Sequence, residues 1–186
     1  MRFVFVRHGE TNDNTARVLI GQTDPELNEW GIQQSMELLS GLEGDFQVIY
    51  ASPLKRTRRT AEILGRQLNI PLILRDELKE RDVGSLAGET WEQINEQQRA
   101  DLKTMDARQK YDYRPFGGES VEQVKQRILK FIGEALSKKH KRVLVVSHAG
   151  VIRIMYDLFS DGQVSGIRHA SIHEFELCST SAKEIC

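Results

Sequence analysis

Short runs of apolar residues alternate along this chain with longer stretches in which apolar residues recur every three or four positions. The runs at 3–6 and 143–146 are uninterrupted, a pattern typical of strands that are buried on both faces of a parallel sheet. Shorter runs at 47–51, 71–74 and 172–177 predict three further strands. Strands that alternate with helical stretches in this way indicate an α/β fold.

Helical spacing of apolar residues predicts the helices between these strands. The first helix is expected to begin at Asn28, a favoured cap residue, and its spacing turns Ile32, Met36 and Leu39 toward the core. The second is expected directly after the strand at 47–51, with Ser52 as its cap and the following proline in the first helical position. Later stretches predict an amphipathic helix from residue 120 and an apolar one over 151–159.

A more polar helix is predicted over 90–110. Thr90 and Gln93 have the spacing of a capping box, and only a few apolar anchors follow, among them Ile94, Leu102 and Met105. A helix of this kind is expected to belong to an insertion that covers a site. The whole chain, 1–186, is therefore predicted to be one domain, a three-layer α/β sandwich with a mainly parallel central sheet and a small helical cap insertion at about 90–118.

A histidine follows each of the two most apolar strands. Arg7 and His8 come directly after the first, and Ser147 and His148 directly after the second. In an open α/β sheet the functional crevice lies beyond the carboxyl ends of the strands, and neighbouring strands are about 5 Å apart. If the two strands are neighbours, the histidines emerge side by side. Each could alternatively be a polar residue that merely ends a strand, but two cases in matching context make that reading weaker.

Basic residues crowd the first turns of the helix that follows residue 53. The residues are Lys55, Arg56, Arg58 and Arg59. Positive side chains at this place are repelled by the positive end of the helix dipole, and a bound anion would make their interaction with the site favourable instead. Helix N-termini after sheet strands bind phosphate groups readily, and arginine matches phosphate oxygens with two hydrogen bonds. A solvated basic surface explains the other three residues equally well, so the pattern singles out only Arg56, for the reason given below.

Composition narrows the class of protein without identifying a site. The 26 basic and 27 acidic residues give a net charge of −1, and we therefore expect no nucleic-acid partner. No apolar segment approaches 18 residues, so no membrane partner is expected either. The chain enters a strand at once instead of presenting a signal region, which predicts a cytoplasmic protein.

Four separated segments, which extend over nearly the whole chain, form one ordered set. They are Arg7-His8-Gly9-Glu10-Thr11-x-x-Asn14, Ser52-Pro53-Leu54-x-Arg56-Thr57-x-x-Thr60-Ala61, Glu80-x-x-x-Gly84-x-x-x-Gly88 and Ser147-His148-Ala149-Gly150. In this order they resemble the histidine phosphatase superfamily, also called the phosphoglycerate mutase-like family, and within it the compact phosphatase branch.

The resemblance implies a phosphoryl group held between two histidines and two arginines. His8 would attack phosphorus to form a phosphohistidine, and Glu80 would protonate the leaving alcohol and later help to activate water. The catalytic residues that it implies are Arg7, His8, Arg56, Glu80 and His148; the substrate-binding residues are Asn14, Gly21, Gln22, Thr23 and Ala149, of which 21–23 match more loosely. His169 stands where family members often carry asparagine, and its contact with substrate is left open.

We therefore expect a metal-independent phosphomonoester hydrolase, without a cofactor, that acts on a small-molecule phosphate ester. The first alternative is a phosphoglycerate mutase, which would share these residues but return the phosphoryl group to a second substrate. This chain has short segments between its motifs and a short tail, whereas mutases of the family generally have longer ones. A non-catalytic phospho-ligand-binding module is a further alternative. A metal hydrolase is disfavoured because guanidinium groups cannot ligate a metal. The substrate and the oligomeric state stay open.

Overall fold

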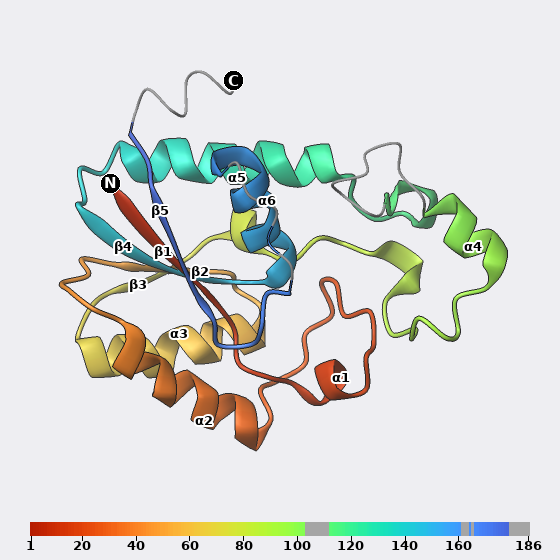
Figure 1. Cartoon of the computed structure of the whole chain (residues 1–186), viewed down its shortest axis with the longest axis horizontal. Helices are drawn as coiled ribbons and strands as arrows, with labels where there is room; N and C mark the ends of the chain where they lie inside the picture. The colour runs from red at the N-terminus through yellow and green to blue at the C-terminus, as the bar shows by residue number, and fades with distance from the viewer. Residues whose placement is uncertain (103–111, 161–163, 165, 179–186) are drawn as a thin grey trace.

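The computed structural model describes residues 1–102, 112–160, 164 and 166–178. Its centre is a five-stranded sheet in the order β3-β2-β4-β1-β5 (Figure 1). Neighbouring strands run parallel except for β5, which pairs antiparallel with β1 at one edge. The predicted mainly parallel sheet is therefore confirmed. The strands are β1 (Arg2–Arg7), β2 (Ile49–Ala51), β3 (Leu72–Leu74), β4 (Arg142–Ser147) and β5 (Ile172–Glu176).

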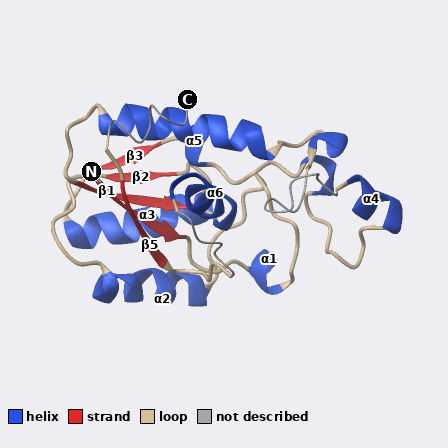
Figure 2. Ribbon diagram, turned by 45° about the horizontal axis from the view of Figure 1, so that its top comes forward, coloured by secondary structure: helices blue, strands red, loops and turns tan. Residues whose placement is uncertain are grey.

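Helices cover both faces of this sheet. In Figures 1 and 2, α5 and α6 lie on one side and α2 and α3 on the other, which confirms the three-layer arrangement. None of the helices in the described part of the chain is long and apolar enough to span a bilayer. The helices are α1 (Asn12–Thr15), α2 (Glu29–Glu37), α3 (Lys55–Leu68), α4 (Glu96–Asp101), α5 (Val121–Leu136) and α6 (Ala149–Phe159), with 3₁₀ turns η1 (Leu38–Gly41), η2 (Asp76–Leu78), η3 (Gly84–Leu86) and η4 (Arg114–Phe116).

The two central strands, β1 and β4, are buried on both faces. Phe3 and Phe5 of β1 pack into the cluster that contains residues of α5 and α6, whereas Val4 and Val6 pack into the opposite cluster with residues of α3. All four side chains are fully buried. Since successive strand residues point to opposite faces, an uninterrupted apolar run is what a strand in the middle layer requires.

The buried face of α2 differs from the one that its apolar spacing predicts. Met36 is 54 % exposed, and the side that faces the protein carries Gly31, Ser35 and Leu38. The Ser35 hydroxyl donates to the carbonyl of Gly31 at 2.7 Å and lies 3.1 Å from Oγ1 of Thr60 in α3. The expectation that Met36 points to the core is therefore wrong, because close contact with α3 and the loop after β1 selects small residues.

The start of α3 is two residues later than predicted. Leu54 occupies the cap position and makes no side-chain cap hydrogen bond, so the expectation that Ser52 caps this helix is wrong. The carboxylate of Asp24, from a distant loop, accepts the N–H of Lys55 at 2.6 Å and satisfies one of the free donors at the helix start. Ser52 is thereby available for another contact, described below.

The helix predicted over 90–110 begins later than expected: within the described residues it is α4, Glu96–Asp101, and the predicted start at Thr90 is wrong. Gln93 accepts the N–H of Thr90 as a capping box requires, but residues 91–94 form a turn and α4 begins only after Asn95. Asn95 and Gln98 form a complete second capping box, which starts the helix there. Of the predicted anchors, Ile94 and Leu102 are buried beside Val83, Leu86 and Tyr113, and Met105 lies outside the described residues. The cap insertion at about 90–118 stays a prediction.

Gly31 provides a test of the close packing of α2. An added Cβ at this position would overlap the backbone of Glu10. We expect Gly31→Ala to lower the free energy of unfolding by about 1–3 kcal/mol, the usual cost of overpacking. Gly133→Ala in α5 is the matched control, because its Cβ meets nothing within 4 Å, and alanine should stabilise that helix by up to about 1 kcal/mol. Urea denaturation measures both shifts, and a Gly31→Ala protein as stable as the parent would contradict the packing.

Candidate active site

The paired histidines lie where β1 and β4 end. Arg7 and Ser147 are register partners in the parallel pair, so His8 and His148 follow at the same edge of the sheet. Their ring centroids are 5.2 Å apart at an interplanar angle of 63°, and their exposed fractions are 3 % and 0 %. The prediction that the two histidines emerge side by side is confirmed.

Hydrogen bonds at the ring nitrogens define how each imidazole can act. Nδ1 of His8 lies 2.7 Å from the carbonyl oxygen of Gly9, which can only accept, so Nδ1 carries the proton and a neutral ring has its lone pair on Nε2. In His148, Nε2 lies 3.0 Å from the Ser52 hydroxyl. Its Nδ1 is buried without a hydrogen-bond partner among the described residues.

Arg56 is the one basic residue at the start of α3 that points inward. It is 1 % exposed, whereas Lys55, Arg58 and Arg59 are exposed as the solvated-surface reading predicts. Its Nη1 donates to the carbonyl of Thr23 at 2.7 Å and its Nη2 to that of Gly21 at 2.9 Å. The loop at 21–23 therefore holds Arg56 through neutral carbonyl oxygens, which leaves the positive charge uncompensated at short range.

Arg7 is held in a similar way from the other side. Its Nη1 donates to the carbonyl of Ile167 at 2.6 Å, and its Nη2 lies 2.6 Å from Nε2 of His169. A guanidinium can only donate, so His169 accepts at Nε2 and is neutral in this contact. His169 thus supports Arg7, and the rings of His8 and His169 have centroids 5.9 Å apart.

Buried donors without partners gather at this site. In the described part of the chain, four buried side-chain nitrogens lack a hydrogen bond, and three belong to site residues, namely Nε of Arg7, Nε of Arg56 and Nδ1 of His148. Most buried polar groups in folded proteins are paired, so each exception needs an explanation. Negatively charged oxygens are the acceptors that guanidinium N–H groups prefer. The arrangement is therefore suited to bind a group with several negatively charged oxygens.

Burial and the arginines set the charge states of the site. Burial lowers the pKa of His8 and of His148 well below 6.5, and the charges of Arg56 and Arg7 lower both pKa values further. Burial also lowers the pKa of Arg7, to about 10, so its guanidinium still carries a charge at neutral pH. The site therefore combines neutral imidazoles, of which one has a free lone pair, with two fixed positive charges.

Glu80 reaches the same edge of the sheet from the loop after η2. Its Oε2 accepts the N–H of Gly150 at 3.2 Å and its Oε1 accepts the N–H of Arg81 at 2.8 Å. A Cβ on Gly150 would overlap the Glu80 carboxylate, so this contact depends on glycine. The N-terminus of α6 favours a negative charge at this point. Glu80 also acts on Arg7 through its charge, which raises the pKa of Arg7 against the larger effect of burial.

The remaining predicted site residues lie around this centre. Oδ1 of Asn14 accepts from N–H and Oγ1 of Thr11 in a capping box, at 3.1 and 3.0 Å, which orients the amide. Nε2 of Gln22 donates to the carbonyl of Glu80 at 3.1 Å. Ala149 is the first residue of α6, directly after His148. Gly21, Gln22 and Thr23 are hydrogen-bonded to Arg56 or Glu80, and Ala149 follows His148 in the chain, whereas the contacts of Asn14 are with Thr11. The contact of all five with substrate stays a prediction.

Three supporting residues were not singled out from the sequence as parts of the site. Ser52 binds His148, although its position before a helix suggested a cap. Thr60 accepts the N–H of Gly9 at 3.2 Å and so orients the turn after His8. His169 binds Arg7. The sequence signal for His169 was that it stands where family members often carry asparagine. Ser52 and Thr60 lie within a segment that matches the family, but the resemblance assigned no role to them.

The buried histidines predict how stability depends on pH. A histidine whose pKa is lowered on folding takes up its proton when the protein unfolds, so its contribution is complete above pH 6.5 and is lost at lower pH. We expect the free energy of unfolding to fall by about 1 kcal/mol for each such histidine between about pH 6.5 and 5.5, because the unfolded-state histidine is only half protonated at the upper end of this range. Urea denaturation checks the slope, which His8→Gln should flatten. A stability independent of pH in this range would contradict neutral buried rings.

Comparison with known proteins assigns the chain to a family. The family model described as the histidine phosphatase superfamily (branch 1) matches residues 3–184. The chain therefore belongs to this superfamily. Its relatives include proteins named as phosphatases and as mutases. It is accordingly a phosphatase or mutase that acts on phosphorylated compounds.

Named relatives and solved structures agree with this assignment. The chain is 35 % identical to a metal-independent phosphoserine phosphatase of Arabidopsis thaliana, over 94 % of this chain and 75 % of the relative. It is 34 % identical to phosphoserine phosphatase 1 of Hydrogenobacter thermophilus, over 84 % and 74 %. The structure of Bacillus stearothermophilus YhfR superposes with a TM-score of 0.81 at 25 % identity, covering 95 % of this chain and 91 % of that one.

Proposed function

We propose that the protein is a metal-independent phosphomonoester hydrolase that acts on a small phosphorylated metabolite through a phosphohistidine at His8. The observation that carries this proposal is the group of unpartnered buried donors on Arg7, Arg56 and His148 next to an imidazole with a free lone pair. A phosphoryl group presents several charged oxygens around one electrophilic atom, and its transfer needs positive groups at those oxygens and a nucleophile in line with the leaving group.

In the first half-reaction Nε2 of His8 attacks phosphorus. The N–P bond forms as the bond from phosphorus to the ester oxygen breaks, and protonated Glu80 gives its proton to that oxygen, so the alcohol leaves neutral. Arg7 and Arg56 bind the phosphoryl oxygens. Nδ1 of His148 can join them as a donor, because a neutral ring that accepts from Ser52 at Nε2 carries its proton on Nδ1.

In the second half-reaction water attacks the phosphohistidine. The Glu80 carboxylate accepts a proton from this water, the N–P bond breaks, and inorganic phosphate leaves while His8 returns to its neutral form. Glu80 thus acts as acid and then as base, as the two directions of proton transfer require. Its Oε2 accepts the N–H of Gly150 at the start of α6, which holds the carboxyl group at this edge of the sheet in both half-reactions.

Substrate binding is proposed for Asn14, Gly21, Gln22, Thr23 and Ala149, which surround the central group. Leaving-group recognition is proposed for the cap insertion at about 90–118. Relatives named phosphoserine phosphatase and a solved mycobacterial glucosyl-3-phosphoglycerate phosphatase, 26 % identical with a TM-score of 0.77, make esters of small hydroxy acids the first compounds to test. Relatives named 2,3-bisphosphoglycerate-dependent phosphoglycerate mutase keep the mutase as the alternative activity.

A panel of phosphorylated metabolites tests the function directly. We expect purified protein to release inorganic phosphate from at least one small ester, phosphoserine among those assayed, and to interconvert 2- and 3-phosphoglycerate slowly if at all. His8→Ala removes the nucleophile and should lower kcat/KM by at least about a thousandfold. Phosphate release and detection of phosphohistidine at residue 8 after a quench without acid are the measurements.

Two controls separate this activity from its alternatives. Activity should be unchanged by EDTA, since the arginines supply positive charge at the phosphoryl oxygens; loss with EDTA and rescue by a divalent ion would favour a metal hydrolase. Interconversion of phosphoglycerates at least about tenfold faster than phosphate release, a difference of about 1.4 kcal/mol in barrier, would assign the mutase instead.

Glu80→Gln tests the proposed acid. An alkyl ester such as β-glycerophosphate needs its leaving oxygen protonated, whereas the phenolate of p-nitrophenyl phosphate hardly does. We expect kcat/KM for the alkyl ester to fall by about 10² to 10⁴, the usual contribution of a general acid, and kcat/KM for p-nitrophenyl phosphate to fall much less. Equal losses on both esters would show that Glu80 has another role.

A further inference from the structure

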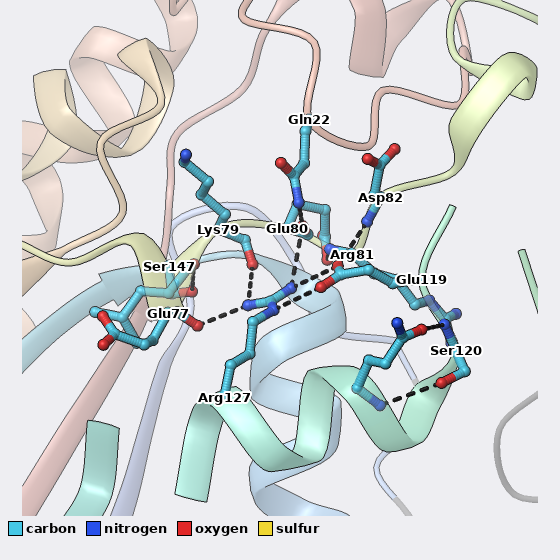
Figure 3. Close-up of polar contacts among 12 residues, drawn as sticks. Gln22, Glu77, Lys79, Glu80, Arg81, Asp82, Glu119, Ser120, Arg127 and Ser147 are labelled. Carbon is cyan, nitrogen blue, oxygen red and sulfur yellow. Dashed lines mark hydrogen bonds and ion pairs between the residues drawn. The ribbon is translucent and has the colours of Figure 1, made fainter. Parts of the chain in front are cut away.

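One guanidinium, that of Arg127 in α5, holds the segment that carries Glu80 (Figure 3). Its Nη1 donates to the carbonyl of Glu77 at 2.6 Å and to that of Lys79 at 2.7 Å, and its Nη2 donates to the carbonyl of Glu80 at 3.2 Å. The loop at 79–83 lies outside any helix or strand, so it lacks the regular backbone hydrogen bonds that fix residues elsewhere. Arg127 supplies several of the missing donors.

Glu119 fixes the guanidinium in turn. Its Oε1 accepts from Nε of Arg127 at 2.9 Å and its Oε2 from Nη2 at 2.9 Å, a bidentate pair in which both side chains are mostly buried. Oε2 of Glu119 also accepts the N–H of Asp82 at 2.9 Å, and the N–H of Glu119 donates to the carbonyl of Asp82 at 2.9 Å. The ion pair therefore anchors the loop on both sides of Glu80.

Other side chains complete the anchoring of this segment. The hydroxyl of Ser147 donates to the carbonyl of Leu78 at 2.8 Å, and Gln22 donates to that of Glu80. Figure 3 shows these groups converging on the loop from different elements. Every carbonyl from 77 to 80 is thus bound, and three of the four are bound by Arg127.

We infer that Arg127, fixed by Glu119, is a positioning residue that sets the place of Glu80 for proton transfer. The inference rests on the proposed function. Proton transfer requires the acid within about 2.6–3.2 Å of the leaving oxygen, and a misplacement of about 1 Å can cost about a hundredfold in rate. The side-chain hydrogen bonds of Arg127 go to the carbonyls of residues 77, 79 and 80 and to the Glu119 carboxylate, so its direct contacts position the loop of Glu80. Its charge also lowers the pKa of His148, and Arg127→Lys keeps this charge while it alters the contacts with the loop.

Arg127→Met tests this role because it keeps the side-chain length and removes the donors. We expect kcat/KM for β-glycerophosphate to fall by about 10- to 100-fold and kcat/KM for p-nitrophenyl phosphate by less than about 3-fold, the signature of a displaced acid. In the Glu80→Gln background the same substitution should change either value by less than about 3-fold, because residues that act as a unit are not additive. Arg127→Lys, which keeps donors for the carbonyls, should lie between parent and Arg127→Met.

Arg75→Met is the matched control, because Arg75 lies directly before η2, on the N-terminal side of this loop. Arg75 binds the carboxylates of Glu77 and Glu134, and no hydrogen bond joins its side chain to the described residues 79–82. It should leave the ratio of the two kcat/KM values unchanged. Equal losses on both esters in Arg127→Met, or an additional loss in the Glu80→Gln background, would overturn the inference.

Two further measurements keep the test decisive. If Arg127→Met does not fold, Arg127→Lys and Glu119→Gln replace it in the test. We then expect kcat/KM to fall for β-glycerophosphate and not for p-nitrophenyl phosphate. Equal losses on both esters would again overturn the inference. A failure of the proposed function is recognised separately, in the parent protein and in Glu80→Gln alone. If Glu80→Gln shows the leaving-group signature and the Arg127 variants do not, only the positioning role is wrong.

Discussion

The parallel pairing of β1 with β4 is the contact on which the rest of this molecule depends. Six residues of each strand are in register, from Arg2 opposite Arg142 to Arg7 opposite Ser147. Because side chains alternate between the faces of a sheet, a shift by one residue would exchange the two apolar clusters and separate the histidines. The same register that fills both cores therefore also places His8 next to His148.

The site combines buried positive charge with incomplete pairing. Among the described residues neither Arg7 nor Arg56 forms an ion pair, and both bind neutral acceptors from loops. Burying a charge without an ion-pair partner is costly, and burial lowers the pKa of both arginines although the charge of Glu80 acts in the opposite direction. A fold selected only for stability would avoid such an arrangement. It is consistent with a site whose missing counter-charge is the phosphoryl group of a substrate.

Irregular segments carry several of the site residues, and side chains from distant elements hold them. Thr60 of α3 fixes the turn after β1, Ser52 fixes His148, and Arg127 of α5 fixes the loop of Glu80. These contacts replace the backbone ladder that positions residues within helices and strands. The geometry of the site therefore depends on the packing of α3 and α5 against the sheet as well as on the loops themselves.

The sequence by itself determined the strands, the mainly parallel sheet, the cap of α2 at Asn28 and the two histidines after β1 and β4. Uninterrupted apolar runs and helix caps are local signals in the sequence. Once a buried strand has been predicted from such a run, the position of a histidine at its end follows. The motif resemblance added Glu80, since an acid in a loop has no periodicity that would distinguish it from solvated neighbours.

Only the tertiary structure decided which residues support these groups. Met36 has the spacing of a core residue, yet Gly31 and Ser35 face the protein because α2 lies close to the backbone of another loop. Asp24 takes the capping role expected of Ser52, and Arg127 looks in the sequence like any polar position of an amphipathic helix. Each of these roles is set by a partner far away in the chain, and local patterns carry no information about such partners.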